Sequence, residues 1–92
     1  MEHTACKVKI EGIVQGVGFR FFTEDRAREY GITGYVKNMY DGSVEVYAEG
    51  NKDALEKFIE DLKEGPRMSR VRNTEVRWLE AEKQYDAFTI SY

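Results

Sequence analysis

The 92-residue sequence has one cysteine, one histidine and one proline, and it has no long apolar run. A single cysteine excludes an intramolecular disulfide, and one histidine beside it leaves no Cys/His cluster with metal-ligand spacing. No stretch of about 18 apolar residues is present, and no apolar segment follows the first methionine, so neither a membrane span nor a secretory signal is indicated. These absences favour a cytoplasmic protein without a membrane partner.

A strong excess of one charge is also lacking. Fourteen basic residues stand against 17 acidic ones, which gives a net charge of −3. Nucleic-acid binding normally requires a positive surface, so we expect no nucleic-acid partner, and any anion site must be local. The length leaves room for one domain, so we expect residues 1–92 to form a single, monomeric domain, with residues 1–5 frayed because chain ends lose order unless tied down.

Hydrophobic periodicity predicts two helices set among five strands. The strand patterns cover residues 6–11, 33–38, 43–49, 74–79 and 88–92. One helix is predicted over 19–30, ended by Gly31, and a second over 52–64, begun by Asn51 and ended by Gly65. The dipeptide Asp41-Gly42 is typical of a hairpin turn between the second and third strands.

This order of elements predicts an α+β fold. It is most simply satisfied by a ferredoxin-like βαββαβ sandwich, with a mainly antiparallel sheet, both helices on one face and a short extra strand at the C-terminus. Such folds serve as metabolite sensors, RNA binders and enzymes, so the function has to be argued from a site.

A glycine-rich segment lies between the first predicted strand and the first helix. Residues 12–20 read Gly-Ile-Val-Gln-Gly-Val-Gly-Phe-Arg. Glycine permits positive φ and close approach of N–H groups to a ligand, and the helix start adds unpaired N–H donors and the positive end of the dipole. Arg20 contributes a planar fork that fits phosphate or carboxylate oxygens. The segment predicts a local anion site; the alternative is an ordinary connection in which Arg20 pairs with Glu24.

Several phosphate chemistries are excluded by residues that the segment lacks. No lysine follows the glycines and no third glycine completes a dinucleotide fingerprint, so ATP and NAD are not expected. A cysteine phosphatase would place its thiolate six residues before the arginine, where this chain has Val14. Cys6 falls on the apolar face of a strand, where we expect a core residue, and His3 falls in the expected frayed terminus. If phosphate is hydrolysed here, water must attack directly.

Asn38 is the second candidate, at the end of a predicted strand. An amide in that position commonly serves the following turn. It cannot act as a base near neutral pH, but its oxygen and NH₂ can hold a water molecule in line with a bound phosphoryl group. From the residues alone, both interpretations stay open.

Taken together, these segments resemble a known family. The segments are Gly12-x-Val14-Gln15-Gly16-Val17-x-Phe19-Arg20, then Gly34-Tyr35-Val36-Lys37-Asn38, then Asp41-Gly42-Ser43-Val44, and the closing Phe88-x-Ile90. They are similar to the acylphosphatases from about residue 7 to residue 92. Acylphosphatases are small ferredoxin-like hydrolases that convert an acyl phosphate to a carboxylate and inorganic phosphate, without metal or cofactor, and the resemblance implies the same activity here.

The resemblance also implies roles for individual residues. Arg20 would bind the phosphoryl group, and Asn38 would orient the attacking water. Backbone N–H groups of the loop would share the phosphoryl group with Arg20; they belong to Gln15, Gly16, Val17, Gly18, Phe19 and Arg20 itself. Inorganic phosphate would be both product and competitive inhibitor. Some members of the family have a hydroxyl residue directly after the asparagine, where this chain has Met39.

Three alternatives accompany this interpretation. The same motif occurs in the acylphosphatase-like N-terminal domain of hydrogenase-maturation carbamoyltransferases, but we expect no further domain after Tyr92 and therefore a free-standing enzyme. A non-catalytic RNA-binding module could stack bases on Tyr35, Tyr47 and Trp78, although the basic-aromatic motif of such proteins is missing. A metabolite or anion sensor would keep the loop but need an inert Asn38.

Overall fold

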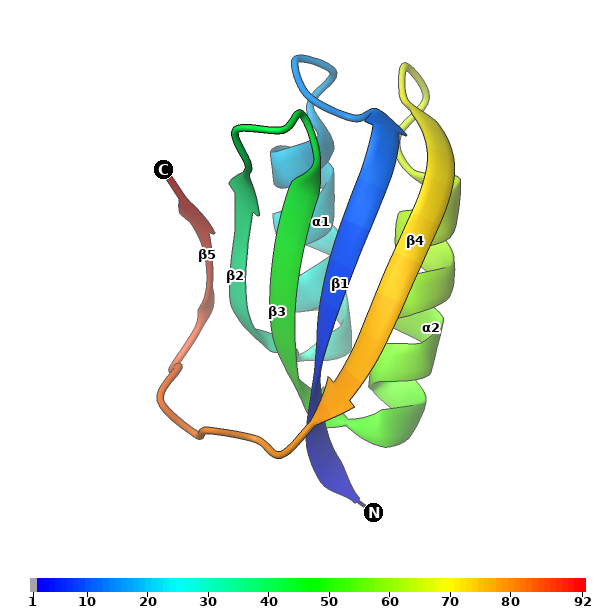
Figure 1. The fold of residues 1–92 in the computed structure, drawn as a ribbon. Coiled ribbons are helices and arrows are strands. Elements are labelled where there is room, and N and C mark those ends of the chain that lie inside the picture. Colours follow the sequence, from blue (N-terminus) through cyan, green and yellow to red (C-terminus); the bar gives the residue numbers. More distant parts are fainter. Residues whose placement is uncertain (1) are drawn as a thin grey trace.

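Alternating strands and helices form a two-layer α+β sandwich in the computed structural model, which describes residues 2–92 (Figure 1). The elements in chain order are β1 (His3–Ile13), α1 (Phe19–Tyr30), β2 (Thr33–Asn38), β3 (Val44–Asn51), α2 (Lys52–Glu64), β4 (Arg70–Leu79) and β5 (Phe88–Ser91). The predicted order and the predicted extents of both helices are confirmed. Neither helix has the length and apolar character needed to cross a bilayer.

The strands form one sheet in the order β4-β1-β3-β2-β5. β1 runs antiparallel to both β3 and β4, and β2 runs antiparallel to β3, while β5 joins the far edge parallel to β2. Both helices cover the same face (Figure 1). The ferredoxin-like prediction is therefore confirmed, and the pairing of the last strand, which the sequence does not determine, is with β2.

The fourth strand starts earlier than its predicted first residue, Thr74. β1 continues past a bulge at Glu11/Gly12, and its last residues, Gly12 and Ile13, pair with Val71 and Arg70. Because β1 supplies this extra length of partner backbone, β4 forms hydrogen bonds over residues 70–73, where no alternating pattern marks a strand.

The N-terminal residues correct one expectation. Residues 3–5 are not frayed, because their backbone pairs with residues 49–51 of β3. The hydroxyl of Thr4 also donates a hydrogen bond to the carbonyl of Leu79 (3.0 Å), and Ala5 is fully buried. The part of the prediction that concerns Met1 lies outside the described residues. A terminus paired on both sides within a sheet is tied down, which is the condition under which chain ends stay ordered.

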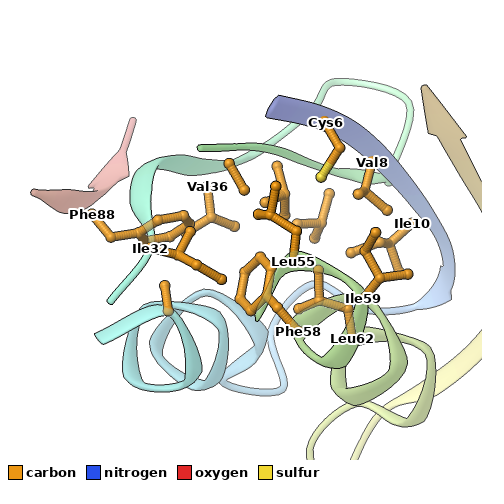
Figure 2. Close-up of a cluster of buried hydrophobic side chains, with 14 of the residues drawn as sticks. Cys6, Val8, Ile10, Ile32, Val36, Leu55, Phe58, Ile59, Leu62 and Phe88 are labelled. Carbon is orange, nitrogen blue, oxygen red and sulfur yellow. The ribbon is translucent and has the colours of Figure 1, made fainter. Parts of the chain in front are cut away.

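The core fills the space between the sheet and the helices (Figure 2). Cys6, Val8 and Ile10 alternate along β1 and are fully buried, which confirms the prediction that Cys6 is a core residue. The apolar stripe of α2 packs onto them; it consists of Leu55, Phe58, Ile59 and Leu62. Burying each large apolar side chain stabilises the fold by about 1.5–3 kcal/mol. This packing fixes the helices against the sheet.

On the opposite face of the sheet, a buried carboxylate holds the connection between β4 and β5. Glu49 accepts hydrogen bonds from the hydroxyl of Tyr47 (2.6 Å) and from the backbone N–H groups of Glu82 (2.7 Å) and Lys83 (2.9 Å). Burial alone would raise the pKa of Glu49, but these hydrogen bonds, that of Tyr47 first, hold its pKa below the usual value. The ionised carboxylate therefore holds the backbone of Glu82 and Lys83, in the segment that leads to β5, against the sheet.

Replacing Glu49 with glutamine should lower the free energy of unfolding by about 1–3 kcal/mol at neutral pH, because all three hydrogen bonds reach one carboxylate oxygen and a neutral amide oxygen in its place accepts them less strongly. A lowered pKa means that the contribution of the carboxylate is present above its unfolded pKa of about 4.3 and is lost as the pH falls through the lower folded value. Urea denaturation at a series of pH values checks this. The difference in the free energy of unfolding between wild type and Glu49→Gln should disappear in acid. A difference that does not depend on pH would contradict the role of the ionised Glu49 carboxylate.

Candidate functional site

The loop of residues 14–18 joins β1 to α1 at one end of the sheet (Figure 1). Gly16 and Gly18 have φ values of 76° and 79°, in the left-handed region that favours glycine. A Cβ added at either would meet no atom within 4 Å, so the backbone conformation, and not crowding, requires glycine there. Gly12 differs, because its Cβ would lie 2.0 Å from the carbonyl oxygen of Arg70 at the bulge. Glycine is therefore required by the backbone conformation at Gly16 and Gly18, and by the close approach of β4 at Gly12.

The loop leaves a row of backbone donors without protein partners. Gly18 is the N-cap of α1, no side chain caps that end, and the first turn contains no acidic residue. Within residues 2–92, no group accepts a hydrogen bond from the N–H groups of residues 15–20. Unpaired N–H groups at a helix start, with the positive end of its dipole, form a site suited to an anion.

A cavity of about 220 Å³ opens beside these donors. It is lined by Val14, Gly16, Gly18, Phe19, Arg20, Phe21 and Asn38. The structure thus brings together the two predicted catalytic residues and four of the six predicted backbone positions. Gln15 and Val17 are outside the lining, and Val17 packs against the core. Phe21 was not anticipated, because an exposed aromatic residue at a helix start carries no distinctive sequence signal.

Arg20 faces the cavity without a carboxylate partner. None of the ion pairs among the described residues includes it, and Glu24 pairs with Arg28 instead (3.2 Å). The guanidinium of Arg20 lies over the ring of Tyr92, 5.0 Å from its centroid. A ring beneath the guanidinium plane supports it while its N–H edge stays available to an anion. The alternative in which Arg20 pairs with Glu24 is therefore wrong.

Asn38 lines the same cavity. It is the last residue of β2, and its Oδ1 atom is buried without a hydrogen-bond partner. Leaving a buried acceptor unpaired costs about 1–3 kcal/mol, which a polar ligand would recover. The following turn is held by other groups, since the N–H of Met39 donates to the carbonyl of Ser43 (2.8 Å). The turn therefore makes no use of the Asn38 oxygen.

Asp41 closes that turn. It accepts hydrogen bonds from the hydroxyl (2.6 Å) and the N–H (3.0 Å) of Ser43, and it pairs with Lys9 (3.2 Å). These contacts, with the Ser43 hydroxyl first, lower the pKa of Asp41 to about 2. Asp41 is therefore ionised near neutral pH and does not serve as a proton donor.

The side chains most suited to covalent phosphoryl chemistry lie elsewhere. Cys6 is in the core, and burial raises the pKa of its thiol to about 12. His3 begins the 11-residue strand whose other end leads into the loop, which separates the two by about 30 Å. Residues 2–92 contain no group of three His, Cys, Asp or Glu side chains placed to hold a metal ion. The residues that line the cavity supply backbone N–H groups, a guanidinium and an amide side chain.

The three aromatic residues considered for an RNA platform do not share a surface. Tyr47 and Tyr35 stack together on the open face of the sheet, and Tyr47 is only 3% exposed. Trp78 pairs with Cys6 in register and so points to the helix face, where its ring lies near Lys52. Bases could not stack on all three rings at once, so this alternative loses its structural basis.

The chain is similar to known proteins over most of its length. The model of the acylphosphatase family matches residues 6–90. An acylphosphatase of Thermotoga petrophila is 48% identical over 88 residues, which are 96% of this chain and 97% of that protein. An acylphosphatase of Archaeoglobus fulgidus is also 48% identical, over 96% of this chain and 98% of its own length.

Solved structures give the same result. The crystal structure of acylphosphatase from Bacillus subtilis has a TM-score of 0.93 at 37% identity, and the match covers 97% of this chain and 99% of that one. The crystal structure of full-length HypF in its phosphate- and nucleotide-bound form has a TM-score of 0.87 at 34% identity. That match covers 99% of this chain but 12% of HypF, so the same architecture also forms a small part of a much larger protein.

Proposed function

The chain belongs to the acylphosphatase family, and from that premise we propose that it hydrolyses acyl phosphates to a carboxylate and inorganic phosphate in the cavity beside residues 14–18. One observation carries the proposal. Residues with unpaired backbone N–H groups (Gly16, Gly18 and Phe19), Arg20 and Asn38 line one cavity that has room for a phosphoryl group.

The loop binds the phosphoryl group. N–H groups of residues 15–20 and the fork of Arg20 donate to its equatorial oxygens, where negative charge is concentrated as the bond to the leaving group breaks. A cation in the first turn of a helix is unfavourable by about 0.3–1 kcal/mol, and a bound dianion reverses that cost for Arg20. The donors are fixed before the substrate arrives, because Gly16 and Gly18 already hold the left-handed conformation.

Asn38 orients the attacking water. Its Oδ1 accepts a hydrogen bond from a water molecule, and the water oxygen attacks phosphorus while the bond from phosphorus to the acyl oxygen breaks. A neutral amide cannot remove the proton, so the proton passes to a phosphate oxygen of the substrate. The carboxylate leaves with the bonding electron pair and needs little help from an acid. Met39 offers no hydroxyl beside the water, so Asn38 acts without such an aid from that position.

The reaction as proposed needs no cofactor, metal ion, nucleic acid or membrane. All the groups that it uses come from one chain, so a monomer with residues 1–92 as a single domain suffices, and we place it in the cytoplasm. Inorganic phosphate, as product, binds to the same phosphoryl cradle, which consists of the N–H groups of residues 15–20 and the guanidinium of Arg20, and it inhibits competitively.

A direct test is the hydrolysis of benzoyl phosphate by the purified chain. We expect turnover that is unchanged by an excess of a metal chelator, because the cavity supplies its positive charge from N–H groups and Arg20. We also expect competitive inhibition by inorganic phosphate in steady-state kinetics. A rate that falls on chelation and returns with a divalent cation would contradict the metal-free mechanism.

Arg20→Lys should lower kcat/KM for benzoyl phosphate by about 10²-fold or more, because lysine keeps the charge but loses the two-pronged contact. Arg28→Lys is the matched control, since it makes the same exchange on the exposed face of α1, where Arg28 pairs with Glu24. Steady-state kinetics of both variants decide the question. If Arg20→Lys keeps most of the activity, the bidentate role is wrong.

Asn38→Ala should lower kcat by about 10²-fold while the inhibition constant of inorganic phosphate changes by less than about threefold, because the amide holds the water and not the phosphoryl group. Parallel measurement of kcat and of phosphate inhibition separates the two roles. An equal loss of turnover and of phosphate affinity would show that Asn38 serves the local structure instead.

A further inference from the structure

The side chain of Gln15 connects the two halves of the site. Its Nε2 atom donates one hydrogen bond to the carbonyl of Met39 (2.8 Å) and another to the carbonyl of Ser43 (2.9 Å). Both hydrogens of the amide are therefore used. The partners lie 24 and 28 residues further along the chain, so the contact joins separate parts of the fold at the end of the sheet seen at the top of Figure 1.

These two carbonyls belong to the first and last residues of the turn that follows Asn38. The N–H of Met39 donates to the carbonyl of Ser43 (2.8 Å), and the N–H of Gly42 donates to the carbonyl of Met39 (3.1 Å). Gln15 therefore forms hydrogen bonds to both ends of the turn, directly after Asn38. Among the described residues, its two hydrogen bonds are those that join loop residues 14–18 to the turn of residues 39–43.

The geometry points to a positioning role: we propose that the Gln15 side chain sets the distance between the phosphoryl cradle and Asn38, so that the held water is aimed at phosphorus. This proposal rests on the function proposed above. The cradle is fixed to β1 and α1, whereas Asn38 is fixed to β2, and β3 separates these two strands in the sheet. Without Gln15, the loop and the turn can shift relative to each other, and a displacement of about 1 Å between reacting groups costs about 10²-fold in rate.

The rival explanation is that Gln15 only stabilises the turn. The chain offers a control for this, because Asp41 stabilises the same turn through Ser43 and Lys9 without touching the loop. Loss of Asp41 weakens the turn and leaves the connection to the cradle intact. Loss of the Gln15 amide removes that connection and keeps the backbone N–H of Gln15.

Gln15→Met keeps the length and approximate volume of the side chain and removes both donors. We expect kcat for benzoyl phosphate to fall by about 10- to 100-fold, with KM and the inhibition constant of inorganic phosphate within about threefold of wild type. Asp41→Ala should keep kcat within about threefold of the wild-type value, even if its melting temperature falls as much as that of Gln15→Met. Thermal melts establish that both variants are folded at the assay temperature.

A double-mutant cycle with Asn38→Ala tests whether Gln15 acts through Asn38. If it does, adding Gln15→Met to Asn38→Ala should change kcat by less than about threefold, because no held water remains to be misplaced. A Gln15→Met variant with wild-type kcat overturns the proposal. Equal losses of kcat in Gln15→Met and Asp41→Ala would also overturn it. So would a loss of kcat on adding Gln15→Met to Asn38→Ala that is as large as the loss in the wild-type background.

The outcomes also separate this proposal from the proposed function. If Asn38→Ala alone leaves kcat unchanged, the water-holding role is wrong, and a positioning role that acts through Asn38 is wrong with it. If Asn38→Ala lowers kcat but Gln15→Met does not, the proposed function stands and the positioning role alone is refuted.

Discussion

The site depends on backbone N–H groups that the protein itself cannot satisfy. The N–H groups of residues 15–20 have no acceptor among residues 2–92, and they lead into the start of α1, where Gly18 provides no cap and no acidic side chain compensates the dipole. The left-handed conformation at Gly16 and Gly18 aims these donors, and Arg20 adds a cation where a helix alone would disfavour it. An anion bound there would resolve both conflicts, so under the proposed function a stability cost in the free protein becomes binding energy for a phosphoryl group.

Sheet topology explains why this cradle meets Asn38. β1 and β2 are both antiparallel to β3, which lies between them, so they run in the same direction and end at the same edge of the sheet. The loop follows the end of β1, and Asn38 closes β2. Two segments 18 residues or more apart in the chain are thereby brought to one cavity, and the Gln15 amide spans the distance that remains. The arrangement resembles open α/β sheets, in which ligands bind beyond the carboxyl ends of neighbouring strands.

Local patterns in the sequence were enough to predict the helices, the strand order along the chain and the two segments that meet at the cavity. Local patterns could not predict which backbone segments distant in sequence pair with one another. β5 pairs with β2, residues 3–5 are held by β3, and β4 begins at Arg70 because β1 offers it a partner. For the same reason, no pattern pointed to Tyr92 beneath Arg20 or to the side chain of Gln15 across the turn, since each contact joins residues distant in sequence.

The central claim is that residues 15–20 bind the phosphoryl group through their backbone N–H groups. Titration of inorganic phosphate into ¹⁵N-labelled protein, followed by NMR, tests it most directly. The amide protons of residues 15–20 should move downfield together and saturate at one dissociation constant, which should equal the inhibition constant measured in the assay. Saturable shifts confined to another part of the surface, with these amides unmoved, would contradict the claim.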